Sequence, residues 1–174
     1  MNIVFLDIDG VLQPYDNELR FAHIDNSIIQ KLSDKYNIDY NQYGFYDVCA
    51  VYYDWEEQAV SRLKYILDET NSKIIISSDW RTERQPNKMK DLLAIQELDK
   101  YYFADNILLK DYLYSVKKRA LEIKNSLDTY DINNYVVLDD MRGLEEYYPN
   151  NTVITHDYIK IKDMKECIKI LKKN

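Results

Sequence analysis

Short, mainly apolar segments alternate along this chain with longer stretches in which apolar residues recur at helical spacing. The apolar segments lie at residues 2–6, 73–77, 135–138 and 152–155. The stretches with helical periodicity lie at residues 56–70, 115–127 and 163–172, and Ser115 can cap the second of them. Strands that are apolar on both faces are typical of parallel sheets, because helices cover such sheets on both sides. The alternation therefore predicts an α/β fold with three layers and a Rossmann-like parallel sheet at its centre.

The length of the chain bounds the number of domains. A chain of 174 residues, of which 46% are hydrophobic, is expected to form one domain, residues 1–174, around one core. Residues 36–53 are the least regular part of the chain and the richest in aromatic side chains.

Charge and cysteine content narrow the classes of partner. A net charge of −7 argues against non-specific binding to duplex DNA or to anionic membranes, which basic patches drive. No apolar run reaches about eighteen residues, so no membrane span is predicted. Cys49 and Cys167 match neither a disulfide framework nor a zinc motif, and such cysteine usage is typical of the reducing cytoplasm. Nothing in the sequence identifies a stable protein partner.

Polar residues follow each of the first three predicted strands. The sequences are DIDG at 7–10, SSDWR at 77–81 and DD at 139–140. In parallel sheets, ligands bind beyond the carboxyl ends of the strands. Carboxylates gathered there repel one another unless a cation offsets the charge, and oxygen-only ligands suit Mg²⁺ rather than zinc. Because Mg²⁺ prefers few carboxylates together with waters and a substrate phosphate, the pattern predicts a phosphorylated substrate.

Each of these motifs also has an ordinary structural interpretation. A lone Asp-x-Asp is usually a solvated turn, two adjacent aspartates can cap a helix, and paired serines are common in loops. Their joint placement after three separate strands favours the functional interpretation, since chance would scatter them over both edges of the sheet.

Three segments resemble motifs of haloacid-dehalogenase-like (HAD) phosphohydrolases. FLDIDGVL at 5–12 resembles the first motif, IIISSDWR at 74–81 the second and VVLDD at 136–140 the fourth. With the RALEI sequence at 119–123, the chain is similar over nearly its full length to the HAD domain of Swiss Army Knife RNA repair proteins. The departure is the aromatic segment 13–53, which the resemblance identifies as a small cap inserted after the first strand.

The resemblance implies a phosphatase that forms an aspartyl-phosphate. Asp7 would be the nucleophile, and Asp9 would be the general acid and base. Mg²⁺ would be held by Asp7, by the backbone carbonyl of Asp9 and by Asp140. Asp139 and Glu145 would assist through contacts one step further from the ion.

The same resemblance implies the residues that hold the phosphoryl group. Ser77 would donate a hydrogen bond to a phosphoryl oxygen, with Ser78 as the alternative. The third motif supplies a lysine or arginine that offsets charge, and Lys117, Lys118 and Arg119 all qualify. Arg119 has the expected spacing, whereas Lys118 is the usual residue type, so both remain candidates.

Four further residues lie within these motifs and have other expected roles. Gly10 would let the chain turn tightly beside the nucleophile. Arg81 would either grip a phosphate or form a surface ion pair. Trp80 is expected to pack rather than to stack on a base. Asp79 adds negative charge where the family often has a small residue.

The substrate implied is a nucleotide or a phosphate at a nucleic-acid end, and a phosphorylated small metabolite is the alternative. The aromatic residues of the cap would stack a nucleobase or, as we favour, form the cap's own core. A long polyanion is expected only if cationic side chains gather at the rim of the site. The candidates are Arg81, Arg84, Lys117, Lys118 and Arg119.

Two non-enzymatic classes remain as alternatives. A receiver-like signalling domain carries its acidic pair adjacent after the first strand, which the spacing of Asp7 and Asp9 does not match. A non-catalytic interaction module would be free to lose Asp7, Asp9, Ser77 and Asp140, and all four are present.

Overall fold

In the part of the chain that the structure describes, five parallel strands form one sheet in the order β3-β2-β1-β4-β5. The computed structural model describes residues 1–23, 25–81, 85, 87–109 and 115–173. The strands are β1 (Asn2–Leu6), β2 (Ser72–Ile76), β3 (Tyr102–Asp105), β4 (Asn134–Asp139) and β5 (Thr152–Ile154). The α/β fold with a parallel sheet that the sequence predicts is confirmed.

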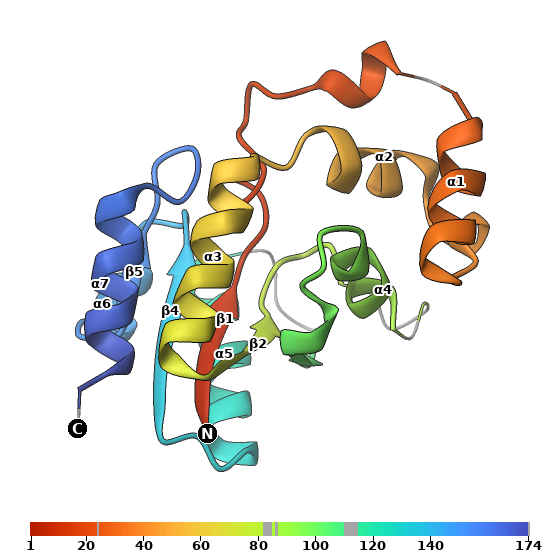
Figure 1. Ribbon diagram of the computed structural model, residues 1–174. Coiled ribbons are helices and arrows are strands. Elements are labelled where there is room, and N and C mark those ends of the chain that lie inside the picture. The colour runs from red at the N-terminus through yellow and green to blue at the C-terminus, as the bar shows by residue number, and fades with distance from the viewer. Residues whose placement is uncertain (24, 82–84, 86, 110–114, 174) are drawn as a thin grey trace.

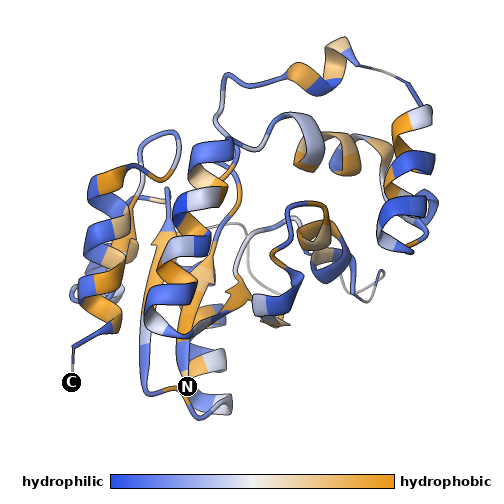
Figure 2. Cartoon of the chain, in the orientation of Figure 1, coloured by the Kyte–Doolittle hydropathy of each residue, from blue (hydrophilic) through white to orange (hydrophobic). Residues whose placement is uncertain are grey.

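Helices cover both faces of this sheet (Figure 1). α3 (Glu57–Thr70) and α7 (Ile161–Leu171) lie on one face, and α5 (Val116–Thr129) and α6 (Leu144–Tyr147) lie on the other. Figure 2 shows apolar strands between helices that are polar on one side and apolar on the other. The three layers follow from that difference, because only a sheet buried on both faces tolerates strands without polar residues.

Alternate residues of β1 serve the two layers. Val4 and Leu6 belong to the larger hydrophobic cluster, which includes α3 and α7. Ile3 and Phe5 belong to the smaller cluster, which includes α5 and α6. β1 is therefore buried on both faces and lies at the centre of the sheet, where it anchors the residues that follow it.

Local signals set the ends of the long helices. The Ser115 hydroxyl accepts a hydrogen bond from the backbone N–H of Lys118 at 3.2 Å, which confirms the predicted cap of α5. Asn71 ends α3 in the left-handed conformation, with φ of 49°. None of the described helices is long and apolar enough to cross a membrane.

Residues 36–53, whose sequence pattern is the least regular of the chain, lie in a part of the structure that is largely helical. After the short 3₁₀ helix η1 (Leu19–Ala22), the chain forms α1 (Ser27–Tyr36), the 3₁₀ helix η2 (Tyr40–Gln42) and α2 (Phe45–Tyr53). α2 has apolar residues around much of its circumference because it packs against both α1 and α4 (Lys88–Ile95), so its sequence has no clear polar face. The aromatic and β-branched residues that fill it also have modest helix propensity.

The sequence pattern also misses α4, the 3₁₀ helix η3 (Asp99–Tyr101) and β3. β3 has four residues, lies at the edge of the sheet and keeps its side chains partly exposed. Such a strand lacks the continuous apolar run that identifies β1 and β2.

Tyrosines attach the segment 13–53 to α4. The Tyr36 hydroxyl donates to the backbone carbonyl of Ile95 at 3.0 Å, and the Tyr40 hydroxyl donates to that of Asp91 at 2.7 Å. The Tyr43 hydroxyl donates to the Asp91 carboxylate. All three rings are at least partly buried, so these aromatics are anchors between helices.

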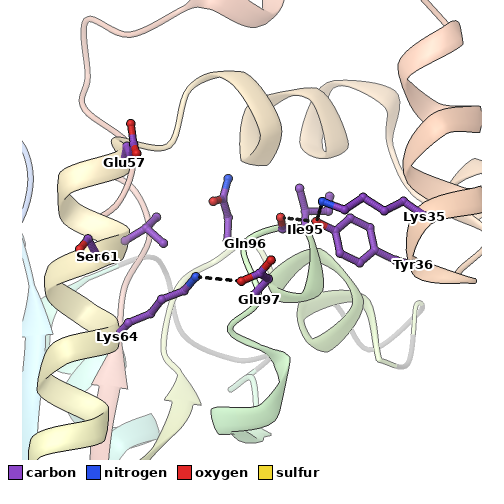
Figure 3. A pocket seen from close by; sticks show the side chains of 9 residues that line it. Lys35, Tyr36, Glu57, Ser61, Lys64, Ile95, Gln96 and Glu97 are labelled. Carbon is purple, nitrogen blue, oxygen red and sulfur yellow. Dashed lines mark hydrogen bonds and ion pairs between the residues drawn. The ribbon is translucent and has the colours of Figure 1, made fainter.

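A hollow of about 330 Å³ separates this helical segment from α3 (Figure 3). Both lysines that line the hollow have a partner there. The Lys64 amine lies 3.6 Å from the carboxylate of Glu97, and the Lys35 amine donates a hydrogen bond to the Tyr36 hydroxyl. α1, α2 and α4 therefore contact one another more closely than they contact α3.

We predict that Tyr40→Phe lowers the free energy of unfolding by about 1 kcal/mol, because a fully buried ring keeps its packing but loses one hydrogen bond. Tyr46→Phe is the control, since the Tyr46 ring is exposed; its effect should stay within about 0.5 kcal/mol. Chemical denaturation of both variants measures the difference. Equal stability of the two variants would contradict the anchoring role of Tyr40.

Candidate active site

The residues that follow the strands stay in sheet register, which brings them together at one edge. The Asp7 backbone N–H donates to the carbonyl of Leu138 at 3.0 Å, and the Ser77 N–H donates to that of Leu6 at 2.9 Å. Because β1 lies between β2 and β4, Asp7 is flanked by Ser77 on one side and by Asp139 on the other. The chain connections run in opposite directions from β1, which is where parallel sheets form ligand crevices.

Three carboxylates form a tight group at this edge. Asp7, Asp139 and Asp140 each place one carboxylate oxygen within 4.8 Å of those of the other two. Burial and, after it, the charge of Asp7 raise the pKa of Asp140 to about 6. Burial and the same charge also raise the pKa of Asp139, and the ion pair with Arg119 acts in the opposite direction. Holding these charges together therefore costs free energy that a cation would offset.

Arg119 is the third-motif candidate that reaches the carboxylates. Its guanidinium Nη1 lies 2.8 Å from Asp139 Oδ2 and 3.3 Å from Asp7 Oδ1, and Nη2 lies 3.4 Å from Asp79 Oδ2. The Lys118 amine instead lies 3.9 Å from the carboxylate of Glu122, and Lys117 is exposed. The exposed Asp79 therefore forms an ion pair with the buried Arg119, and its negative charge is partly neutralised there.

Asp9 is held by a tryptophan. The Trp80 indole N–H donates to Asp9 Oδ2 at 2.9 Å, and its ring also packs against Trp55 with ring centres 6.1 Å apart. Burial raises the pKa of Asp9, whereas this hydrogen bond lowers it. The sequence analysis expects Trp80 only to pack, and no local signal beyond its place after the serines indicates the contact with Asp9.

The two serines after β2 differ in their contacts. Ser77 is fully buried, and its hydroxyl has no hydrogen-bond partner among the described residues. The Ser78 hydroxyl accepts from the backbone N–H of Trp80 at 3.4 Å, within its own loop. Buried hydroxyls are normally paired, so the Ser77 hydroxyl is the one available to a ligand.

Gly10 is required at its position. Its φ is +68°, and a Cβ built there would lie 2.9 Å from the side chain of Asp140. The Thr155 hydroxyl, after β5, donates to the Gly10 carbonyl at 2.7 Å and fixes the same turn. Thr155 carries no signal in the sequence beyond its place at the end of an apolar strand.

Arg81 fits neither of the two interpretations that the sequence leaves open. It is 3% exposed, so it is not a surface ion pair, and its guanidinium contacts the Glu122 carboxylate and the carbonyls of Ser77, Ser78 and Asn106. These contacts turn the guanidinium toward the protein interior. A direct grip on a phosphate therefore has no support in this geometry.

Glu145, the candidate for an indirect contact with the metal, lies apart from the carboxylate group. The exposed Glu145 carboxylate accepts a hydrogen bond from the backbone N–H of Gly143 at 2.8 Å.

The cationic rim that the sequence suggests is incomplete in the described residues. Arg81 and Arg119 are internal, and Arg84 lies outside the described residues. Of the proposed rim, Lys117 and Lys118 remain near the surface. In addition, the exposed Tyr15 hydroxyl donates to Asp140 Oδ2, a contact that no sequence motif marks.

The side chains at this edge fit a hard divalent cation next to an anion. The acidic group offers only oxygen ligands, and burial, followed by the charge of Asp7, raises the pKa of Asp139 and of Asp140. The unpartnered Ser77 hydroxyl follows β2, on the other side of Asp7 from Asp139, and the Arg119 guanidinium contacts both aspartates. Both groups suit a phosphoryl group. The donor chemistry thus agrees with Mg²⁺ rather than zinc.

Comparison with known proteins identifies one family. The family model described as the HAD domain in Swiss Army Knife RNA repair proteins matches residues 3–163, which include every residue of the site. Neither a curated protein nor a solved structure matches the chain.

We predict that Gly10→Ala lowers the free energy of unfolding by about 1–2 kcal/mol and weakens divalent-metal binding, because the left-handed backbone is strained and the new methyl group collides with Asp140. Gly44→Ala is the matched control: its φ is negative, and its nearest contact is at 3.3 Å with the flexible Asp47 carboxylate. Denaturation and metal titration compare the two. Unchanged metal affinity in Gly10→Ala would contradict the close approach of Gly10 to Asp140.

Proposed function

Because this chain belongs to the family of HAD domains in Swiss Army Knife RNA repair proteins, we propose that it is a magnesium-dependent phosphatase that hydrolyses a phosphomonoester. Membership of the family implies phosphohydrolase-type activity and, in general, a divalent metal. The observation that carries the finer proposal is that Asp7 belongs to the acidic group with Asp139 and Asp140 and also contacts the Arg119 guanidinium, at 3.3 Å.

We assign the metal to the acidic group. Asp7, Asp140 and the backbone carbonyl of Asp9 would hold Mg²⁺, with Asp139 assisting from its ion pair with Arg119. When bound, Mg²⁺ would supply positive charge for the oxygens of the transferring phosphoryl group.

The reaction would proceed in two displacements. A carboxylate oxygen of Asp7 attacks phosphorus, the bond from phosphorus to the leaving oxygen breaks, and protonated Asp9 gives its proton to that oxygen. Water then attacks the aspartyl-phosphate, Asp9 takes the water's proton, and inorganic phosphate leaves while the Asp7 carboxylate is regenerated. The burial that raises the pKa of Asp9 favours the protonated form that the first displacement needs.

Two side chains would stabilise the phosphoryl group. The Ser77 hydroxyl, which is buried and unpartnered, would donate to a phosphoryl oxygen. Arg119, rather than Lys118, would offset charge on the transferring group because it contacts the nucleophile directly. Ser78 stays a secondary candidate for the same oxygen, and Gly10 keeps the turn beside Asp140 clear.

The family points to nucleic-acid or phosphorylated substrates, and we propose a terminal phosphate on a nucleotide or on a nucleic-acid end, with a small metabolite as the alternative. The segment 13–53 would act as a small cap, since it follows the residues at the carboxyl end of β1 and its α2 helix packs against α4, to the side of the sheet (Figure 1). Because Arg81 and Arg119 are internal, few cations remain to follow a polyanion. Recognition would therefore centre on the terminal phosphate.

The proposal predicts that Asp7→Asn lowers turnover of phosphomonoesters by at least about 10³-fold while the protein stays folded, since an amide is not a competent nucleophile. Mg²⁺ and Mn²⁺ should support the wild-type reaction, and Ca²⁺ should bind but support little turnover. Phosphate release measures the effect, with Asp34→Asn on the exposed face of α1 as the control. Substantial activity in folded Asp7→Asn, or activation by Zn²⁺ alone, would exclude the mechanism.

The internal position of the arginines predicts a weak dependence on salt. Activity on a 5′- or 3′-phosphorylated oligonucleotide should be similar to that on the matching mononucleotide, and log(kcat/KM) should fall with log[salt] with a slope of magnitude about 1–2. Both substrates are compared between about 50 and 200 mM salt. A steep slope with a strong oligonucleotide preference would mean that a basic rim exists after all.

A further inference from the structure

We propose that the buried ion pair between Arg81 and Glu122 is a positioning clamp: it fixes the Ser77 loop relative to helix α5, so that the Ser77 hydroxyl and the Arg119 guanidinium face one phosphoryl group. The inference rests on the proposed phosphatase function and assigns a role to two motif residues that the reaction itself does not use. Both side chains are 1% exposed.

Arg81 holds the loop after β2 from the inside. Its Nη1 donates to the backbone carbonyls of Ser77 and Ser78, and its Nε donates to the carbonyl of Asn106 at 3.0 Å. Asn106 follows β3, and its backbone N–H donates to the carbonyl of Ile76 at 2.9 Å. One guanidinium therefore fixes the ends of two neighbouring strands, which its planar set of donors allows.

Glu122 extends this contact to α5. One carboxylate oxygen accepts from Arg81 Nη2, and the other accepts from the backbone N–H of Leu109 at 3.0 Å. One turn further along the helix, the Ser126 hydroxyl donates to the Asn106 side chain at 2.5 Å. α5 is thus fastened to the carboxyl ends of β2 and β3 by polar contacts at two successive turns.

Arg119 lies on the same face of α5, one turn before Glu122. Residues at spacings of three and seven share a helix face, and Arg119, Glu122 and Ser126 are all buried. A shift of α5 against the β2 loop would therefore move Arg119 and Ser77 relative to each other. The acidic residues Asp7, Asp139 and Asp140 follow β1 and β4, whose pairing does not involve the clamp.

Stability alone is a poor explanation for such a pair. Taking two charges out of water costs much of what their attraction returns, and apolar pairs of similar volume often stabilise a protein equally well. The Arg81 donors, however, also satisfy three loop carbonyls, which an apolar side chain cannot do. The pair is therefore suited to holding one loop conformation at the active site.

The test compares Glu122→Gln and Arg81→Lys with the wild-type protein. Glu122→Gln keeps the shape of the side chain but removes its charge, and Arg81→Lys keeps the charge but loses the planar donors. Both should lower kcat about 10–100-fold, with a smaller rise in KM, because a misplacement of about 1 Å has effects of this size. The inhibition constant for orthovanadate should rise in parallel, whereas the affinity for Mn²⁺ should not fall.

Thr70→Val is the matched control for lost stability. Thr70 is buried just before β2, at the opposite end of the strand from Ser77, and its hydroxyl donates to the Ile66 carbonyl at 2.6 Å. Thr70→Val should lower the Tm because it removes a buried hydrogen bond next to the start of β2, while the residues at the carboxyl end of that strand stay unchanged. It should leave kcat and vanadate inhibition within about threefold of wild type.

Three results would overturn the clamp. If both variants lower only the Tm, and their kcat and vanadate inhibition resemble those of Thr70→Val, the ion pair stabilises the fold and has no positioning role. If Mn²⁺ affinity falls together with kcat, the whole site has loosened rather than its phosphate side. If the wild-type protein itself hydrolyses no phosphomonoester, the proposed function fails, and the clamp fails with it; an active wild type with unaffected variants refutes the clamp alone.

Discussion

Mutual repulsion among Asp7, Asp139 and Asp140 is the constraint on which the rest of the site depends. The three carboxylates lie at the ends of adjacent central strands, and burial raises the pKa of Asp140 and of Asp139. Two features make this arrangement possible within the protein. Arg119 contributes positive charge from α5, and the turn at Gly10 brings backbone, without a Cβ, against Asp140. A bound cation completes the same balance, so metal binding and the local fold are linked.

A second layer of buried polar contacts holds the phosphate side of the site. Arg81 and Glu122 connect the loops after β2 and β3 to α5, and Arg119 projects from the same helix face. Buried polar groups are costly unless they are satisfied, and a satisfied network specifies one arrangement. The site is therefore positioned by two parts of the fold: β1 and β4 hold the acidic residues, and α5 with the β2 loop holds the groups that, in the proposed function, would face the phosphoryl group.

The tyrosine-rich segment is part of the architecture rather than an appendage. Tyr36, Tyr40 and Tyr43 fasten it to α4, and its apolar residues share the larger hydrophobic cluster with β1. Its α2 helix packs against η1, α1 and α4, to the side of the sheet (Figure 1). Two of the candidate arginines, Arg81 and Arg119, are internal, which is why the substrate we propose is a terminal phosphate rather than a long polyanion.

The sequence alone determined the parallel sheet, the Ser115 cap and the gathering of acidic residues at one edge, because strand periodicity, capping and strand-end position are local properties. It did not reveal α2 or β3, whose apolar patterns depend on neighbours distant in the chain. Only the tertiary structure selected Arg119 over Lys118: adjacent residues on a helix point about 100° apart, and packing decides which faces the sheet. Packing also paired Arg81 with Glu122, 41 residues away, and so turned a candidate phosphate ligand into the interior.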